Sequence, residues 1–273
     1  TGGNNDCLKL SGIDDFWVLD STIARCGGGT SGSGVDCVGC HAGLIARNRL
    51  EQMSGNAVQA KGGSADLEIR WNHLVSPGAR GFNLGGSTGF AFFRPPLSTT
   101  VANAEARRIE AIGNLIVGGD TPFAFVGCVD CVAAHNTVVN PATWLMRILQ
   151  ETTSGGGFPF EPAANGQVVN NLFYFEDGDI STHVNIGPNT SPETFDFAHN
   201  LWFAWDAPGA SAPTLPSAEA GGIYGQNPQL TADWQIPGTS PAAGAGAAQA
   251  WLTGDRFGRC YGSPPSLGAH EAP

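Results

Sequence analysis

A short pattern of apolar and polar residues recurs along the chain. In LEIRWNHL, residues 67–74, apolar and polar side chains alternate as in a half-buried strand, and an asparagine stands near its end. The same phrase returns as WVLDSTI (17–23), LIARNRL (44–50), EIRWNHL (68–74), EAIGNLI (110–116), VAAHNTV (132–138), VVNNLFY (168–174) and FAHNLWF (197–203). The aligned column reads Ser21, Asn48, Asn72, Asn114, Asn136, Asn171 and Asn200. Such self-similarity predicts stacked supersecondary units that bury their apolar faces against each other.

The spacing of the column predicts the size of each unit. Successive members are 27, 24, 42, 22, 35 and 29 residues apart. The shortest intervals fit one coil of a three-strand solenoid, and the longer ones fit the same coil with inserted loops. An asparagine at a bend between strands satisfies backbone groups locally and tolerates left-handed backbone angles. Stacked at ~4.8 Å, the amides can also bond to each other as a ladder. We therefore expect a structural role for this column.

An earlier strand precedes each asparagine phrase. These strands are CLKL (7–10), VDCV (35–38), VQAK (58–61), FNLG (82–85), FAFV (123–126), MRIL (146–149) and VNIG (184–187). Because strand side chains alternate, their first and third residues point inward. The outward column is then Lys9, Asp36, Gln59, Asn83, Ala124, Arg147 and Asn185, and the next outward column contains Lys61. Both lysines of the chain thus fall on one face.

The extra residues of the long intervals gather beside this face. They lie at about 86–107, 150–165 and 188–194, each directly after one of the earlier strands. We expect all three to leave the same corner and to wall a groove of roughly 34 Å over the middle and later coils. The insertions carry Arg94, Glu105, Glu151 and Glu161. Phe92, Phe93 and Phe158 either stack on sugar rings in this groove or pin the loops to the body.

Composition narrows the class of protein. The chain has 273 residues, 14% of them charged, and a net charge of −11, so it lacks the basic footprint of nucleic-acid binding. No run of about 18 apolar residues exists, which argues against a membrane span. The 39 glycines and 18 prolines favour turns over long helices. An acidic, charge-poor surface suits a secreted or cell-surface protein, and the abrupt start at DCLKLSG suits a mature form without its leader.

Seven cysteines include two pairs with CxxC spacing. CVGC contains Cys37 and Cys40, and CVDC contains Cys128 and Cys131. Four thiolates that converge would bind zinc, and a single pair in a thioredoxin-like setting would be redox-active. Both pairs instead stand in apolar, strand-like segments. We expect buried or disulfide-bonded structural cysteines.

The asparagine phrases, together with the C-terminal stretch GTSPAAGAG…DRFGRCYGSPPSLGAHE, resemble right-handed parallel β-helix proteins of secreted bacterial type, similar to polysaccharide lyases. The resemblance covers residues 7–203 as coils and 239–271 as the tail. It implies an all-β, single-stranded right-handed parallel β-helix of about seven coils. We expect the coils in residues 1–203 and an irregular tail in 204–273 that packs along the solenoid and caps it. The same scaffold carries lyases, hydrolases, epimerases and adhesins.

The leading expectation for function is a lyase that cleaves an extended, uronate-containing polysaccharide by β-elimination. This reaction needs a group that neutralises the carboxylate, a base and an acid. The candidate catalytic residues are Lys61, Arg80, Arg147 and His183, and the candidate substrate-binding residues are Asp36, Gln59, Asn83, Arg94, Glu151 and Asn185. No cofactor is certain. Calcium stays open as a neutraliser, although the chain lacks an aspartate cluster and no metal ligands are predicted.

Other functions stay open. A non-catalytic glycan-binding, adhesive or structural module would use the same groove without chemistry. A hexuronate epimerase would share the proton abstraction but would not cleave. A hydrolase would need two carboxylates across the scissile bond, for which Glu151 with Glu161 or Glu105 is available. His135 and His199 each precede a ladder asparagine, and we expect them to be surface histidines rather than a zinc pair.

Overall fold

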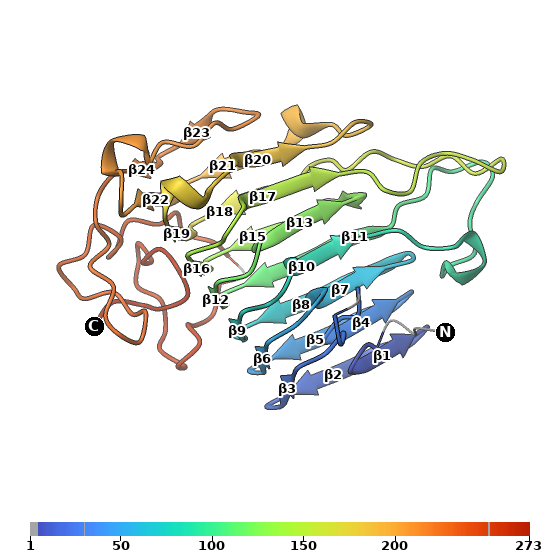
Figure 1. Ribbon diagram of the computed structural model, residues 1–273, viewed down its shortest axis with the longest axis horizontal. Coiled ribbons are helices and arrows are strands. Elements are labelled where there is room, and N and C mark those ends of the chain that lie inside the picture. Colours follow the sequence, from blue (N-terminus) through green and yellow to red (C-terminus); the bar gives the residue numbers. More distant parts are fainter. Residues whose placement is uncertain (1–4, 30, 251) are drawn as a thin grey trace.

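Three parallel β-sheets form the body of the protein (Figure 1). The computed structural model describes residues 5–29, 31–250 and 252–273. The chain visits the three sheets in turn, and each strand pairs in parallel with the strand one circuit earlier. This all-β arrangement is consistent with a β-solenoid and compatible with a parallel β-helix. We call the sheets A, B and C in the order of the circuit.

Sheet A holds the strands that were expected before the asparagine phrases. Its strands are β1 (Leu8–Ser11), β4 (Val35–Val38), β7 (Asn56–Lys61), β10 (Arg80–Gly85), β13 (Phe123–Val126), β17 (Trp144–Leu149) and β20 (Thr182–Ile186). Their inward side chains, including Phe82, Phe123 and Phe125, are fully buried in the core. Apolar residues at every second position therefore suffice to make this sheet one wall of the core.

Sheets B and C lie on either side of the asparagine column. Sheet B contains β2 (Asp14–Leu19), β5 (His41–Ala46), β8 (Ser64–Arg70), β11 (Ala106–Ile112), β14 (Cys128–Val129), β15 (Val132–Ala134), β18 (Gln167–Val169), β21 (Asp196–Ala198) and β23 (Glu219–Ala220). Sheet C contains β3 (Thr22–Ala24), β6 (Arg49–Glu51), β9 (His73–Val75), β12 (Leu115–Val117), β16 (Thr137–Val139), β19 (Leu172–Phe175), β22 (Leu201–Ala204) and β24 (Ile223–Tyr224). Four short 3-10 helices stand in the described connections: η1 (Phe90–Phe92), η2 (Asp177–Asp179), η3 (Pro192–Thr194) and η4 (Pro208–Ala210).

The predicted asparagine ladder is confirmed. Asn136 is fully buried, and its Oδ1 accepts hydrogen bonds from the backbone N and the side-chain Nδ2 of Asn114, at 2.9 and 3.0 Å. Its own Nδ2 donates to Ala111 O and to Asn171 Oδ1. The same pattern runs from Asn48 to Asn200. Every polar atom of the Asn136 amide is therefore satisfied inside the core.

The left-handed backbone lies one residue earlier than we expected. The residue before each column member has a positive φ, and these residues are Asp20, Arg47, Trp71, Gly113, His135, Asn170 and His199. The bend between sheets B and C is thus made by a neighbour of the asparagine. The asparagine side chain then bonds across the bend instead of adopting the left-handed conformation itself.

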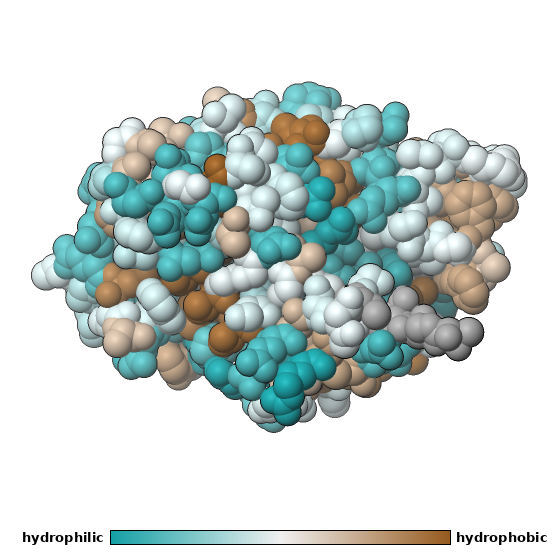
Figure 2. Space-filling view, viewed as in Figure 1, coloured by the Kyte–Doolittle hydropathy of each residue, from teal (hydrophilic) through white to brown (hydrophobic). Residues whose placement is uncertain are grey.

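The first two insertions, residues 86–105 and 150–165, pack against each other beyond the ends of the sheet A strands (Figure 1). Phe90 packs on Phe158 and Phe160, and Phe93 packs edge-on against Phe160, with ring centroids 5.5–5.9 Å apart. Figure 2 shows hydrophobic side chains gathered at the right edge of this face, over the insertions. Phe93 and Phe158 therefore pin the loops, whereas Phe92 is 70% exposed.

The ladder of strands extends beyond residue 203 before the tail begins. β23 and β24 add a short strand to sheets B and C, and the chain then packs along these two sheets without further strands in its described residues. Its residues bond to Trp71, Asn170 and Thr137 of earlier circuits. The tail also covers His135, which is fully buried against Tyr261. The expectation that His135 is a surface histidine is wrong.

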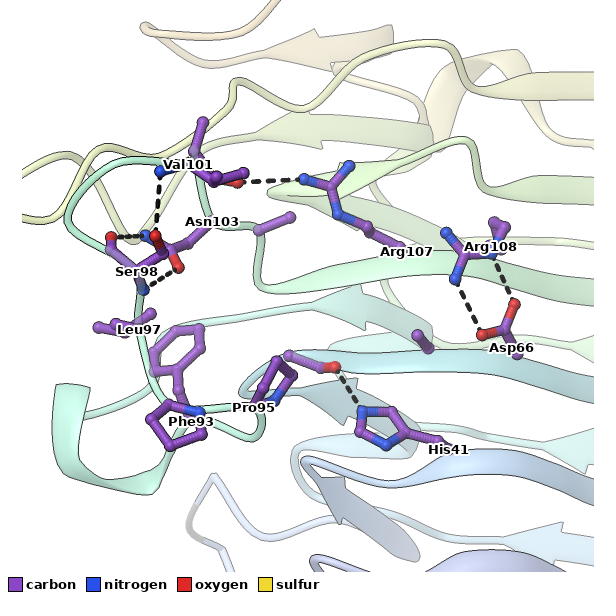
Figure 3. Close-up of a pocket in the computed structure, with 15 residues that line it drawn as sticks. His41, Asp66, Phe93, Pro95, Leu97, Ser98, Val101, Asn103, Arg107 and Arg108 are labelled. Carbon is purple, nitrogen blue, oxygen red and sulfur yellow. Dashed lines mark hydrogen bonds and ion pairs between the residues drawn. The ribbon is translucent and has the colours of Figure 1, made fainter.

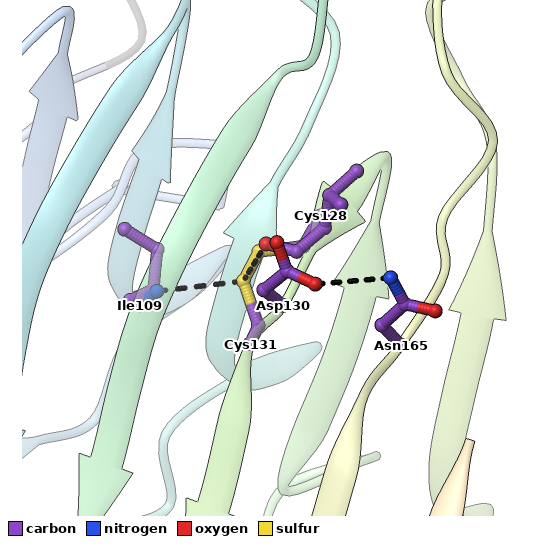
Figure 4. The surroundings of a disulfide bond; sticks show 6 residues. Ile109, Cys128, Asp130, Cys131 and Asn165 are labelled. Carbon is purple, nitrogen blue, oxygen red and sulfur yellow. Dashed lines mark hydrogen bonds between the residues drawn. A yellow bond between two sulfur atoms is a disulfide. The ribbon is translucent and has the colours of Figure 1, made fainter. Parts of the chain in front are cut away.

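Four of the seven cysteines form disulfides. Cys7 bonds to Cys26, and Cys128 bonds to Cys131 beside Ile109 (Figure 4). Cys37 and Cys40 are buried free thiols, and Cys260 is exposed. Because the second CxxC pair is a disulfide, the two pairs do not form a four-thiolate zinc site.

Candidate functional site

The outward column of sheet A has the predicted register. Lys9 pairs with Asp36, Asp36 with Gln59, Gln59 with Asn83, Asn83 with Ala124, Ala124 with Arg147 and Arg147 with Asn185. Lys61 lies two residues further along β7 than Gln59. The pattern of alternation therefore located these backbone positions correctly.

The face is nevertheless closed in its middle. Asn83 is 1% exposed and Ala124 is fully buried, packed with Val126 and Leu149 on the outer side. Gly86, at the start of the first insertion, lies against Gln59 and Lys61, where an added Cβ would stand 2.7 Å from Gln59 Nε2. The start of the first insertion thus lies over Gln59, Lys61 and Asn83 and narrows the predicted groove there.

A pocket of about 370 Å³ remains along β7 and the first half of β10. Its charged side chains are Lys61, Arg80 and Glu151, and neutral polar groups surround them. The lining residues are Ser31, Ser54, Gly55, Asn56, Gln59, Lys61, Ala79, Arg80, Asn83, Ser87 and Glu151. The volume suits a small ligand or a short part of a polymer. We call it the sheet A pocket.

Arg80 is the anchored cation of the sheet A pocket. It begins β10, its Nη1 donates to Asn83 Oδ1 at 2.8 Å, and its Nη2 donates to Glu151 Oε1 at 2.6 Å. Its side chain is 17% exposed, and that of Glu151, from the second insertion, is 34% exposed. One ion pair thus joins two residues that are 71 positions apart in the sequence. A guanidinium can bind a carboxylate through two parallel hydrogen bonds, whereas Glu151 takes one bond from Arg80.

Lys61 stands beside a buried carboxylate. Its Nζ donates to the carbonyl oxygen of Ser87 at 3.5 Å, a long contact. Asp36 is 1% exposed, its Oδ2 accepts a hydrogen bond from Lys9, and its Oδ1 has no hydrogen-bond partner among the described residues. Burial raises the pKa of Asp36, against the hydrogen bond of Lys9 and the charge of Lys61. Asp36 therefore lies under the two lysines and does not face the pocket.

Arg147 and Asn185 form a separate pair beside the pocket. Arg147 Nε donates to Asn185 Oδ1 at 3.0 Å, and its guanidinium lies 4.2 Å from the ring centroid of Trp144. Burial lowers the pKa of Arg147, and the positive charge of Arg80 lowers it further. Arg147 therefore contributes to the potential near the pocket without lining it.

Two other predicted residues lie elsewhere. Arg94 forms an ion pair with Asp14 and donates to Gly39 O, so it fastens the first insertion at the corner between sheets A and B. His183 packs edge-on against Phe175, and its Nδ1 accepts a hydrogen bond from Thr214 N at 3.2 Å. Burial lowers the pKa of His183. Neither side chain lines the sheet A pocket, which corrects their placement in one groove with Arg80.

The carboxylates proposed for hydrolysis are not paired across a cavity. Glu105 is fully buried, and it accepts hydrogen bonds from Gly62 N and Thr88 N. Glu161 forms an ion pair with Arg107 at 2.7 Å. Among the described residues that line the sheet A pocket, Glu151 is the single carboxylate. The arrangement therefore does not favour a two-carboxylate mechanism.

A second cleft, of about 560 Å³, lies between the first insertion and sheet B (Figure 3). Phe93, Pro95, Leu97 and Val101 form its apolar wall. The basic side chains at its rim already have acidic partners: His41 with Asp14, Arg107 with Glu161, and Arg108 with Asp66. This cleft therefore offers an apolar surface, but its basic side chains are already paired with carboxylates and do not form a catalytic arrangement.

Sequence reasoning missed the polar rim of the sheet A pocket. Ser31, Ser54 and Ser87 stand at corners between strands, where alternation no longer predicts direction, and Asn56 is the first residue of β7. Asn56 and Arg80 are register partners at the start of their strands. A polar residue just before a predicted apolar strand was the signal available for Asn56, whereas Arg80 was among the predicted residues.

No family model matches the chain, and no curated protein matches it in sequence. Within the described residues, no group of three or more His, Cys, Asp or Glu side chains is arranged to hold a metal ion. None of the helices in the described part of the chain has the length and apolar character to cross a bilayer. The chemistry of the pocket therefore carries the functional argument.

Proposed function

We propose that this chain is a secreted or cell-surface right-handed parallel β-helix of about seven coils that binds a uronate-containing polysaccharide and cleaves it by β-elimination. The observation that carries the proposal is the presence of Arg80 and Lys61 in one pocket of neutral polar groups. A fixed guanidinium and an amine that can accept a proton are two of the three groups that the reaction needs.

In this mechanism Arg80 binds the substrate carboxylate and stabilises the negative charge that grows when the α-proton leaves. Lys61 in its neutral form is the base, because its amine stands at the pocket wall with a single, long hydrogen bond to the described residues. Asn56 and Gln59 supply hydrogen-bonding groups for sugar hydroxyls. The protonated Lys61 then serves as the proton source for the leaving oxygen.

A binding module without catalysis is the second candidate. It is favoured by the positions of Arg147 and His183, which lie outside the pocket and leave no separate acid beside Lys61 among the described lining residues. An epimerase would need a second proton donor on the opposite face of the sugar ring. The products of the reaction separate these functions.

The test is a panel of polymers of galacturonic, mannuronic, guluronic and glucuronic acid, followed by ultraviolet absorbance from the new C=C bond. Lys61→Ala and Arg80→Gln should each lower the rate at least 100-fold. Arg49→Gln is the matched control, since it removes an exposed ion pair with Glu51 far from the pocket and should not change the rate. Binding without unsaturated product from any polymer would reject the lyase and support the module.

A further inference from the structure

Glu151 occupies the position at which Arg80 would bind a substrate carboxylate. Its Oε1 accepts the hydrogen bond from Arg80 Nη2 at 2.6 Å, inside the pocket that both residues line. A guanidinium that already holds one carboxylate cannot offer the same N–H groups to a second. A uronate can therefore take the place of Glu151 on Nη2 only after the Glu151 side chain has moved, and a uronate bound beside Glu151 would put two carboxylates against one guanidinium.

The two partners are held very differently. Arg80 is fixed from two sides, because its backbone N donates to Gly55 O and its Nη1 donates to Asn83. Glu151 lies in the irregular segment just after β17, and it is twice as exposed as Arg80 (34% against 17%). The contrast with Glu105 is sharp, since that carboxylate is fully buried and bonded to several donors. Glu151 is thus the partner that can leave.

We propose that Glu151 is an internal substitute for the substrate carboxylate, exchanged for the carboxylate of a uronate residue when the saccharide binds. When one carboxylate replaces another, Arg80 keeps a negatively charged partner. An acidic sugar can therefore displace Glu151 at little cost in free energy. A neutral sugar cannot, because it would leave Arg80 without a counter-ion. Arg80 therefore gives the selectivity for acidic saccharides, and Glu151 lowers the affinity of the native chain for them. This inference rests on the proposed uronate ligand but not on the elimination step.

The experiment measures calorimetric affinities for trisaccharides of galacturonic, mannuronic and glucuronic acid, and for neutral galactotriose. Glu151→Gln removes the competing charge, so it should bind at least one acidic trisaccharide about three- to tenfold more tightly than the native chain. Affinity for galactotriose should stay within about twofold. Arg80→Gln should lose the binding of the acidic sugars.

Glu161→Gln is the matched control. Glu161 lies in the same insertion and forms an ion pair with Arg107 at 2.7 Å, against 2.6 Å for Glu151 with Arg80, but outside the sheet A pocket. Its replacement should leave all affinities at the native value. Thermal unfolding of each variant checks that the fold is retained.

Equal or weaker binding of acidic trisaccharides by Glu151→Gln overturns the inference, and so does the absence of acidic-sugar binding by both proteins. Tighter binding without any unsaturated product supports the exchange of carboxylates and rejects the lyase. Unsaturated product together with an unchanged affinity in Glu151→Gln supports the lyase and rejects the exchange of carboxylates.

Discussion

Glu219 takes the place of the next asparagine in the ladder. Its Oε1 accepts hydrogen bonds from the backbone N and the side-chain Nδ2 of Asn200, at 3.1 and 2.8 Å. Each interior asparagine accepts the same two bonds from its predecessor, as Asn171 does from Asn136. The register places Gly222 beside Asn200, where a Cβ would lie 2.5 Å from Glu219 Oε2. A glycine at the ladder position thus makes room for a carboxylate that ends the ladder.

Replacement of Glu219 should destabilise the last circuit. Its Oε2 also accepts hydrogen bonds from Trp202 Nε1 and the Tyr224 hydroxyl, so one carboxylate serves four donors. Glu219→Ala and Glu219→Gln should each lower the free energy of unfolding by about 2–4 kcal/mol, since the amide nitrogen of Gln would face two of the four donors. Urea unfolding measures both. Glu193→Gln, at an exposed glutamate of η3, should change the stability by less than about 0.5 kcal/mol.

Glu105 should hold the two large insertions in place. Its carboxylate binds Gly62 at the corner of sheet A, Thr88 in the first insertion and Thr152 in the second. In Glu105→Gln the amide N–H would face another hydrogen-bond donor. The substitution should therefore lower the free energy of unfolding by about 2–4 kcal/mol. Limited proteolysis should then cleave within residues 90–104 or 153–160 faster than in the native chain. Unchanged cleavage would show that the phenylalanine cluster alone holds the loops.

Buried histidines should make the protein sensitive to acid. Burial under the tail lowers the pKa of His135 to about 3, whereas an unfolded histidine titrates near about 6.5. The unfolded chain therefore binds more protons between these values, and stability falls as the pH drops from about 6.5 toward 3. Each pH unit in this window costs up to about 1.4 kcal/mol for such a group.

The contribution of His135 can be isolated by substitution. His135→Asn keeps a residue that tolerates the positive φ of 52° and removes the titrating ring. Its unfolding free energy, measured in urea at pH of about 7, 5.5 and 4.5, should fall less steeply than that of the native chain. If the unfolding free energies of the two proteins fell equally steeply with pH, His135 would not be the origin of the acid sensitivity.

Much of the fold could be predicted because its signals are local and repeated. The asparagine column and the outward register from Lys9 to Asn185 follow from strand alternation, which needs no knowledge of distant contacts. The three parallel sheets follow from the repeated intervals. The location of the insertions after the sheet A strands was also correct, and so was their common corner.

The candidate site could be predicted only in part. Lys61, Arg80, Gln59, Asn83 and Glu151 do line one pocket, whereas Arg94 and His183 lie elsewhere. Arg94 was misplaced because its insertion runs back to Asp14, eighty residues earlier in the chain. His183 was misplaced because Thr214 and Phe175 close over the corner before β20.

The sequence by itself determined the parallel strands, the inward and outward faces and the ladder of amides, because each depends on spacing between residues in regular backbone. Only the tertiary structure decided which parts of the outer face are covered, which residue ends the ladder and which carboxylate meets Arg80. Those outcomes depend on how irregular segments fold back over the strands, and irregular backbone has no period from which a side chain's direction can be inferred.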